Sequence, residues 1–196
     1  MKKTVLLTLA VTLLFAAAPC ISPAAEVAGV TMDDTIRIGQ STAVLTGMGI
    51  RTKTLLKVKV YVAGLYMEKP SSDTGDIIGS DQPKAMVMTF LYKEVESEKL
   101  QESWREGFEA NTPAAGSDLK ERMEGFISLF TEPARKGDTY VFAYEPGIGT
   151  SVIIGGDARK TIPGADFAGA LMAIWFGEKP GDGGLKALKK SILEGM

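Results

Sequence analysis

The sequence predicts an α+β protein in which a mainly antiparallel sheet is covered on one side by a layer of helices. Segments with a period-two pattern, typical of half-buried strands, occur in one group early in the chain and another group late. Two amphipathic helical stretches lie between these groups, and two more end the chain. Strands and helices therefore do not alternate regularly, as a doubly wound nucleotide-binding fold would require.

The first predicted strands surround an arginine that is preceded by two glycines. Residues 35–38 and 42–46 have alternating character, and the sequence GMGIR follows at 47–51. From 56 to 62 the even positions carry leucine and valine, whereas the odd positions from 57 to 67 change from lysine to apolar side chains near Tyr61. We expect a strand whose even face is buried and whose odd face passes from solvent under a covering layer.

The middle of the chain predicts a central strand and two helices. After a turn-rich stretch at 70–79, residues 85–92 are almost continuously apolar, as in a strand buried on both faces. One helix begins with Ser97 as N-cap and ends at the Asn-Thr-Pro of 111–113, and the next opens at Asp118 with a glutamate three positions later. The apolar stripes of the two helices are Leu100, Trp104 and Phe108, then Leu119, Met123, Phe126, Ile127 and Phe130.

The last third of the chain returns to strands and closes with helices. Residues 139–144 and 150–154 have a period of two, and Gly-Gly-Asp at 155–157 is typical of a hairpin turn. Helical patterns follow at 165–176 and 185–193.

The first 24 residues predict a secretory signal peptide. Two lysines follow Met1, an apolar run occupies 4–18, and small residues lead to a predicted cleavage after Ala24. We expect a linker at 25–34, one domain at 35–196, and a periplasmic or secreted protein that does not span the membrane after cleavage. An uncleaved anchor is the alternative, and lipid attachment at Cys20 is disfavoured because a proline precedes it.

The composition excludes several classes of site. The chain has 196 residues, no histidine and one cysteine, Cys20, which lies within the predicted leader. Ser-His-Asp and Cys-His chemistry are therefore excluded, and a mature chain without Cys20 has no disulfide and no thiolate metal ligand. The net charge of −2 also argues against nucleic acid as a partner. We expect no cofactor and no metal.

Three motifs resemble the chalcone isomerase-like family in its bacterial secreted branch. They are GMGIR at 47–51 followed by KVYVAGLY at 59–66, then SEK at 97–99, and ALMAIWFG at 170–177. The resemblance extends over roughly 47–193. It implies an antiparallel sheet under a helical layer, with a ligand cleft between them, which agrees with the fold class read from the pattern.

The resemblance implies two possible activities. True isomerases of the family have an arginine matching Arg51 and a lysine matching Lys99, but a threonine at the position of Tyr61 and a tyrosine at that of Glu96. The fatty-acid-binding members pair the matching arginine with a tyrosine to hold the ligand carboxylate, and Arg51 and Tyr61 fit that pair. We therefore expect a non-catalytic fatty-acid-binding protein with ligand-binding residues Arg51, Tyr61 and Lys99 and no catalytic residue. The alternatives are an isomerase or intramolecular lyase acting on an unknown substrate, and a module that regulates a partner.

This hypothesis requires the chain to reverse between Arg51 and Tyr61. Ten residues of straight strand span about 33 Å, so we expect a hairpin centred on residues 55 and 56, although residues 52–57 contain no Gly, Pro, Asn or Asp. Other interpretations stay open for each residue: Arg51 paired with a surface acid, Tyr61 closing the rim of the core, and Lys99 solvated at a helix start.

Overall fold

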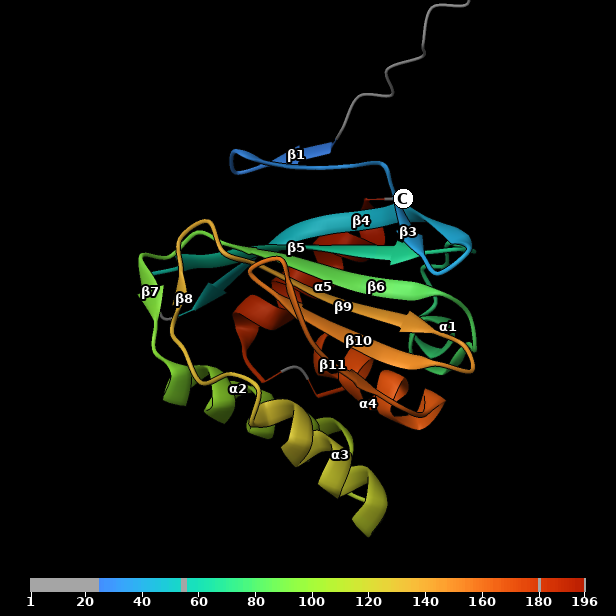
Figure 1. Ribbon diagram of the computed structural model, residues 1–196. Helices are drawn as coiled ribbons and strands as arrows, with labels where there is room; N and C mark the ends of the chain where they lie inside the picture. The colour runs from blue at the N-terminus through green and yellow to red at the C-terminus, as the bar shows by residue number, and fades with distance from the viewer. Residues whose placement is uncertain (1–24, 54–55, 180, 196) are drawn as a thin grey trace, which may run out of the picture.

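The structure, a computed structural model, describes residues 25–53, 56–179 and 181–195. The predicted signal peptide, residues 1–24, lies outside the described residues. The main feature is a seven-stranded sheet with the strand order β11-β10-β9-β6-β5-β4-β3, in which every neighbouring pair is antiparallel. Helices pack along one face of this sheet (Figure 1), so the predicted α+β class is confirmed.

Each element has definite bounds. The strands of the main sheet are β3 (Thr35–Ile38), β4 (Ser41–Lys53), β5 (Val58–Met67), β6 (Lys84–Phe90), β9 (Thr139–Glu145), β10 (Gly149–Ile154) and β11 (Asp157–Ile162). The helices are α1 (Thr74–Gly79), α2 (Ser97–Asn111), α3 (Ser117–Ile127), α4 (Ala165–Phe176) and α5 (Gly183–Glu194). Two small sheets are formed by β1 (Ala25–Val27) with β2 (Val30–Met32), and by β7 (Glu94–Val95) with β8 (Ala134–Arg135).

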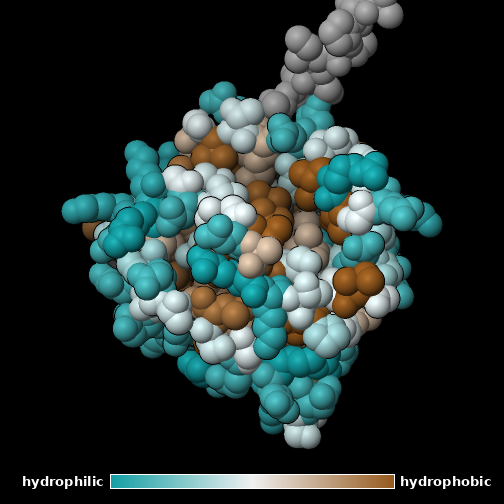
Figure 2. Space-filling model, in the orientation of Figure 1, coloured by the Kyte–Doolittle hydropathy of each residue, from teal (hydrophilic) through white to brown (hydrophobic). Residues whose placement is uncertain are grey.

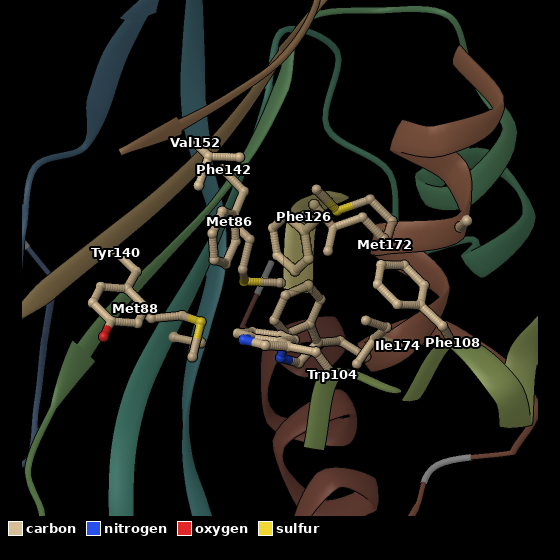
Figure 3. Packing of buried hydrophobic residues seen from close by; sticks show 14 of the residues in the cluster. Met86, Met88, Trp104, Phe108, Phe126, Tyr140, Phe142, Val152, Met172 and Ile174 are labelled. Carbon is tan, nitrogen blue, oxygen red and sulfur yellow. The ribbon is translucent and has the colours of Figure 1, made fainter. Parts of the chain in front are cut away.

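The core lies between the sheet and the helices. Trp104 of α2 reaches into its centre, with Phe126 of α3 and Phe142 of β9 packed edge-on against it (Figure 3). Helix α2 buries its whole predicted stripe, because residues three and four apart share one helix face. Helix α3 buries Met123, Phe126 and Ile127 of its predicted stripe, whereas Leu119 is only partly buried and buried Phe130 lies after the end of the helix. Strand β6, predicted from its apolar run, occupies the centre of the sheet.

The other face of the sheet is also partly covered. Met32 of β2 packs with Met48 and Val62 in a separate apolar cluster, and β1–β2 lies over this side in Figure 1. Residues 25–34, which the sequence predicts as a linker, thus contain a short hairpin. The predicted burial of 56–62 needs correction, because Leu56 lies in the turn before β5 and is 87% exposed. From Tyr61 onward both faces of β5 are buried, since helices cover one face and the hairpin the other.

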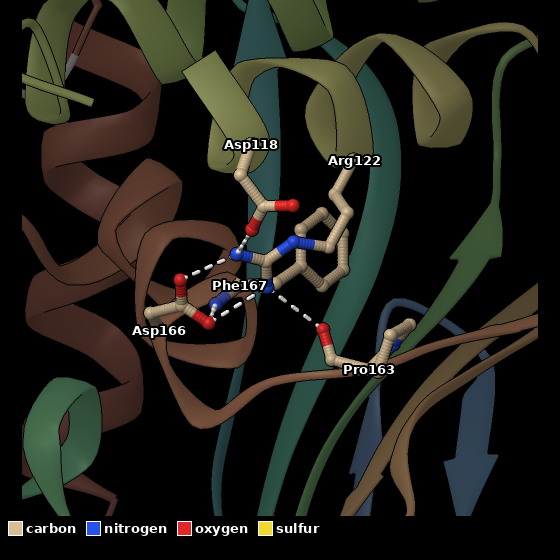
Figure 4. Close-up of polar contacts among 5 residues, drawn as sticks. All are labelled: Asp118, Arg122, Pro163, Asp166 and Phe167. Atoms are coloured by element: carbon tan, nitrogen blue, oxygen red, sulfur yellow. Dashed lines mark hydrogen bonds and ion pairs between the residues drawn. The ribbon is translucent and has the colours of Figure 1, made fainter. Parts of the chain in front are cut away.

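The predicted N-caps, Ser97 and Asp118, lie one and two residues after the actual N-caps. Glu96 caps α2 and Gly116 caps α3, and neither helix has a side-chain capping bond. Asp118 instead accepts a hydrogen bond from Arg122 one turn along α3, at 2.7 Å. Arg122 also binds Asp166 at 2.6 Å and thereby ties α3 to the start of α4 (Figure 4). Asp118 is therefore used in a link between helices rather than in a cap.

Two local features have no counterpart in the sequence prediction. The turn-rich stretch contains the short helix α1. The ammonium of buried Lys84 binds the carbonyl oxygens of Ile77, Ile78 and Ser80 at the end of this helix, at 2.8–3.1 Å.

No helix in the described ranges is both long enough and apolar enough to cross a bilayer. The face seen in Figure 2 carries separate apolar patches interrupted by hydrophilic residues.

Candidate functional site

The candidate site is a cavity of about 620 Å³ between the sheet and the helical layer. This volume falls within the range of about 300–1,000 Å³ that is usual for pockets that hold small ligands. Its walls come from β4, β5 and β6 on one side and from α2, α4 and α5 on the other. Arg51, Tyr61 and Lys99, the three residues predicted from the sequence, all line it. Most of the remaining wall is apolar, with Val58, Val60, Met88, Phe90, Leu100 and Ile174.

The hairpin of β4 and β5 brings Arg51 and Tyr61 together. They are directly opposed in the antiparallel register, and Lys53 pairs with Val58 at the end of the hairpin. The predicted reversal between Arg51 and Tyr61 is thus confirmed. Lys57 adopts a φ of 51° in the connection, which is the left-handed conformation that a glycine or asparagine would otherwise supply. Because opposed residues project to the same face of a sheet, both side chains point to the helical side.

The glycines before Arg51 let α5 lie directly on β4. Gly47, Gly49 and Arg51 occupy alternate positions and therefore share one face of the strand. A Cβ at Gly47 would overlap the backbone carbonyl of Ile192, and one at Gly49 would lie 2.8 Å from the Cβ of Ser191. The Gly-x-Gly pattern thus leaves one face of β4 without side chains, so that α5 packs closely against it. Arg51 lies next to the first turn of α5.

Arg51 is held by two protein acceptors at that point. Its Nη2 lies 2.6 Å from Oδ2 of Asp182, and its Nη1 donates to the carbonyl oxygen of Thr52. These two bonds use two of the five N–H donors of the guanidinium. The Arg51 side chain is 9% exposed and that of Asp182 is 38% exposed, so a nearly buried guanidinium is neutralised by a half-buried carboxylate. This bears out the interpretation of Arg51 as paired with an acid, while Arg51 still lines the cavity.

Asp182 is a site residue that the sequence did not identify. As N-cap of α5, its other oxygen accepts the backbone N–H groups of Gly184 at 2.9 Å and Leu185 at 3.1 Å. An aspartate before a helical pattern is a recognisable cap signal, but nothing in the sequence links it to an arginine 131 residues away. Burial acts to raise the pKa of Asp182, yet Arg51 and the two amides outweigh it and lower this pKa. Asp182 is therefore ionised at neutral pH.

Tyr61 presents a hydrogen-bond donor to the cavity. Its oxygen accepts the indole N–H of Trp175 at 3.1 Å. The phenol proton has no acceptor among the described residues and is free to bind another group. Burial raises the pKa of Tyr61, although Trp175 and Arg51 act in the opposite direction. Tyr61 is therefore a neutral donor near pH 7 rather than a proton acceptor.

Lys99 lies at the outer edge of the cavity. Its side chain is 68% exposed, and its ammonium forms an ion pair with Glu102 at 2.6 Å. This position fits the interpretation of Lys99 as a solvated residue at a helix start. Glu94, Glu96, Glu102 and Glu106 also line the cavity, and Lys99 is already paired with one of them. No group of three or more carboxylate, histidine or cysteine side chains is placed to hold a metal within the described ranges.

Comparisons with known proteins identify the family and support the fold of this chain. Residues 24–193 match the family described as chalcone isomerase-like. Among solved structures, the chain is similar to a fatty-acid binding protein of Arabidopsis thaliana, with a TM-score of 0.65 and 21% sequence identity over 85% of this chain and 92% of that chain. No curated protein matches the sequence at a significant level. At this identity the structural similarity establishes a shared fold.

Proposed function

The chain belongs to the chalcone isomerase-like family, and from this premise we propose that it is a non-catalytic binding protein for a fatty acid or a similar apolar carboxylate. The ligand lies in the cavity between the sheet and the helices, with its carboxylate at Arg51 and Tyr61. As part of the same proposal, the predicted signal peptide directs the protein to the periplasm or out of the cell.

The opposition of Arg51 and Tyr61 at one end of an apolar cavity is the observation that carries this proposal. A guanidinium has five N–H donors, and those that face a carboxylate form charge-assisted hydrogen bonds. The free phenol proton of Tyr61 adds a neutral donor on the same face. An alkyl chain attached to the carboxylate then contacts apolar walls that include Met88, whose flexible thioether adapts to ligand shape.

Asp182 indicates how the carboxylate is held. The bond from Arg51 to Asp182 shows that the guanidinium accommodates a carboxylate at 2.6 Å. The carboxylate of a ligand either binds N–H donors of Arg51 that Thr52 and Asp182 do not use, or replaces Asp182 at Nη2. In the second case Asp182 keeps its bonds to the first turn of α5 and turns toward solvent, to which it is already partly exposed.

The polar residues of the cavity support binding rather than isomerisation. Tyr61 stands where the resemblance implies a threonine in true isomerases, and its raised pKa keeps it protonated at neutral pH. Glu96 lines the cavity where those enzymes have a tyrosine, so the phenol hydroxyl that they place there is missing.

Titration calorimetry with palmitate tests the proposal. We expect wild-type protein to bind palmitate and Arg51→Gln to lose at least about tenfold in affinity, since hydrogen bonds to charged groups contribute about 1.5–3 kcal/mol. Tyr61→Phe removes only the hydroxyl and should lose less. Arg105→Gln is the matched control, because Arg105 also pairs with a carboxylate, that of Glu124 at 3.0 Å, but lies outside this cavity. An Arg51→Gln protein that binds palmitate as wild type does would refute the carboxylate site.

Native mass spectrometry of protein purified from its own compartment provides a second test. Fatty acid that co-purifies with wild type and is lost in Arg51→Gln supports the proposal. Absence of any ligand together with turnover of a chalcone would favour the isomerase instead. For export, sequencing the N-terminus of the mature protein should find Ala25 first, and recovery of the intact chain in the cytoplasm would contradict it.

A further inference from the structure

A second donor lines the cavity, and the carboxylate site does not use it. Trp104 is 5% exposed, and its indole N–H is fully buried with no hydrogen-bond partner among the described residues. Trp104 is also part of the cavity wall, together with Met88 and Leu100, and Figure 3 shows it packed within the aromatic cluster of the core. Buried N–H groups are nearly always paired, so an unpaired one beside a cavity indicates a missing acceptor.

The described residues around Trp104 offer its N–H no acceptor. Its ring is surrounded by Phe126, Phe130 and Phe142, with ring centroids 5.4–5.6 Å away, and none of these side chains can accept a conventional hydrogen bond. The comparable indole of Trp175 is satisfied by the Tyr61 hydroxyl at 3.1 Å. Only one of the two indoles in the core is therefore paired.

The position of Trp104 relative to the carboxylate site determines where the acceptor lies. The rings of Trp104 and Trp175 are 5.7 Å apart, and Trp175 contacts Tyr61 directly. A chain whose carboxylate sits at Arg51 and Tyr61 passes Trp104 within its first few carbons. A ligand oxygen that meets the free N–H must therefore lie near the carboxyl end rather than at the far end.

We propose that Trp104 is a specificity-determining residue that selects fatty acids with a hydroxyl or keto oxygen near the carboxylate over unsubstituted ones. This inference rests on the proposed fatty-acid-binding function and adds the class of ligand to it. The oxygen accepts the Trp104 N–H, while the carboxylate binds Arg51 and Tyr61. An unsubstituted chain fills the same space but leaves the N–H unpaired, which disfavours it.

Affinities for four ligands test the proposal: palmitate, 2-hydroxypalmitate, 3-hydroxypalmitate and 16-hydroxypalmitate. We expect wild-type protein to bind at least one of the 2- and 3-hydroxy acids about 3–10 times more tightly than palmitate, as for one additional neutral hydrogen bond. The 16-hydroxy acid should show no advantage. In Trp104→Phe the preference should disappear, whereas in Ile174→Val, a change in the same wall without a donor, it should remain.

The ratio of affinities separates this inference from the proposed function. Binding of palmitate with no preference for either carboxyl-proximal hydroxyl, or a preference that survives in Trp104→Phe, overturns the role of Trp104 and leaves the binding function intact. A preference for the 16-hydroxy acid also overturns it. Failure of all four ligands to bind wild type overturns both proposals. Because each ratio is measured within one protein, a general loss of affinity in a variant cancels.

Nitrogen-15 NMR of the wild type gives a readout that does not depend on the stability of a variant. The chain contains two tryptophans, so the spectrum has two indole N–H signals, and the signal missing in Trp104→Phe identifies Trp104. We expect this signal to move downfield on addition of the preferred hydroxy acid and to move less with palmitate. Equal shifts with both ligands would refute the hydrogen bond.

Discussion

Gly184→Ala tests whether the first turn of α5 is seated on β4 beside Arg51. A Cβ at Gly184 would overlap the backbone carbonyl oxygen of Thr52 and the Nη1 of Arg51. The carbonyl belongs to a paired strand and cannot move aside as a flexible side chain can. The variant must therefore lift the start of α5 from the strand, which also displaces Arg51.

The expected loss can be isolated with the neighbouring glycine. A Cβ at Gly183 meets no atom within 4 Å, and Gly183 lies in the same first turn of α5. Both substitutions gain up to about 1 kcal/mol from the higher helix propensity of alanine, so this gain largely cancels between them. Only Gly184→Ala also suffers overpacking, which typically costs about 1–3 kcal/mol. We expect Gly184→Ala to be less stable than Gly183→Ala by about that amount.

Thermal unfolding followed by circular dichroism measures this difference. For a domain of this size, 1 kcal/mol corresponds to about 2–4 °C in Tm, so we expect the Tm of Gly184→Ala to lie about 2–12 °C below that of Gly183→Ala. Palmitate affinity should fall only in Gly184→Ala. If the two variants melt together and bind alike, the contact of α5 with Arg51 and the reasoning built on it are wrong.

Three further predictions concern charges. Asp182→Asn keeps a capping side chain but removes the carboxylate that competes for Arg51, so palmitate affinity should rise several-fold in calorimetry, and a decrease would show that Asp182 organises the site. Arg122→Gln breaks the link from α3 to α4 and should lower the free energy of unfolding, measured in urea, by about 1–3 kcal/mol. Arg105→Gln removes an exposed ion pair and should lower it by less than about 1 kcal/mol. Equal losses in the two variants would contradict the role of Arg122 as a link between helices. Stability should also fall as the pH rises from about 10 to 12. Burial raises the pKa values of three tyrosines to about 12, whereas tyrosine in the unfolded chain titrates near 10, so the unfolded chain loses these protons first. A Tm that stays constant up to pH 12 would refute this prediction. The three residues are Tyr66, Tyr140 and Tyr144.

The β4–β5 hairpin is the place where the sequence pattern and the structure differ most. The sequence favours a continuous strand here, since no residue of a common turn is present, and only the resemblance to a family predicts the reversal. In the structure, β4 and β5 pair from Val44 with Met67 to Lys53 with Val58. The backbone hydrogen bonds between β4 and β5 and the buried side chains of this pair together outweigh the unfavourable left-handed conformation of Lys57.

The environment of Arg51 depends on segments far apart in the chain. A single arginine after two glycines is visible in the sequence, but the function of the glycines appears only when α5 packs against them. The pairing with Asp182 likewise follows from the packing of α5, and so does the isolation of the Trp104 N–H among aromatic rings. Small hairpins and helices such as β1–β2 and α1 were missed because their patterns are too short to repeat.

The sequence by itself determined the α+β class, the long strands and helices, and most of the apolar stripes. These follow from periodicity, which backbone geometry imposes locally on each strand or helix. Tertiary structure alone decided which polar groups meet at the cavity: Asp182 with Arg51, and Trp175 with Tyr61. It also left the N–H of Trp104 without a partner among the described residues. The physical reason is that a hydrogen bond or ion pair depends on positions within a few tenths of an ångström, and those positions are set only when distant elements pack together.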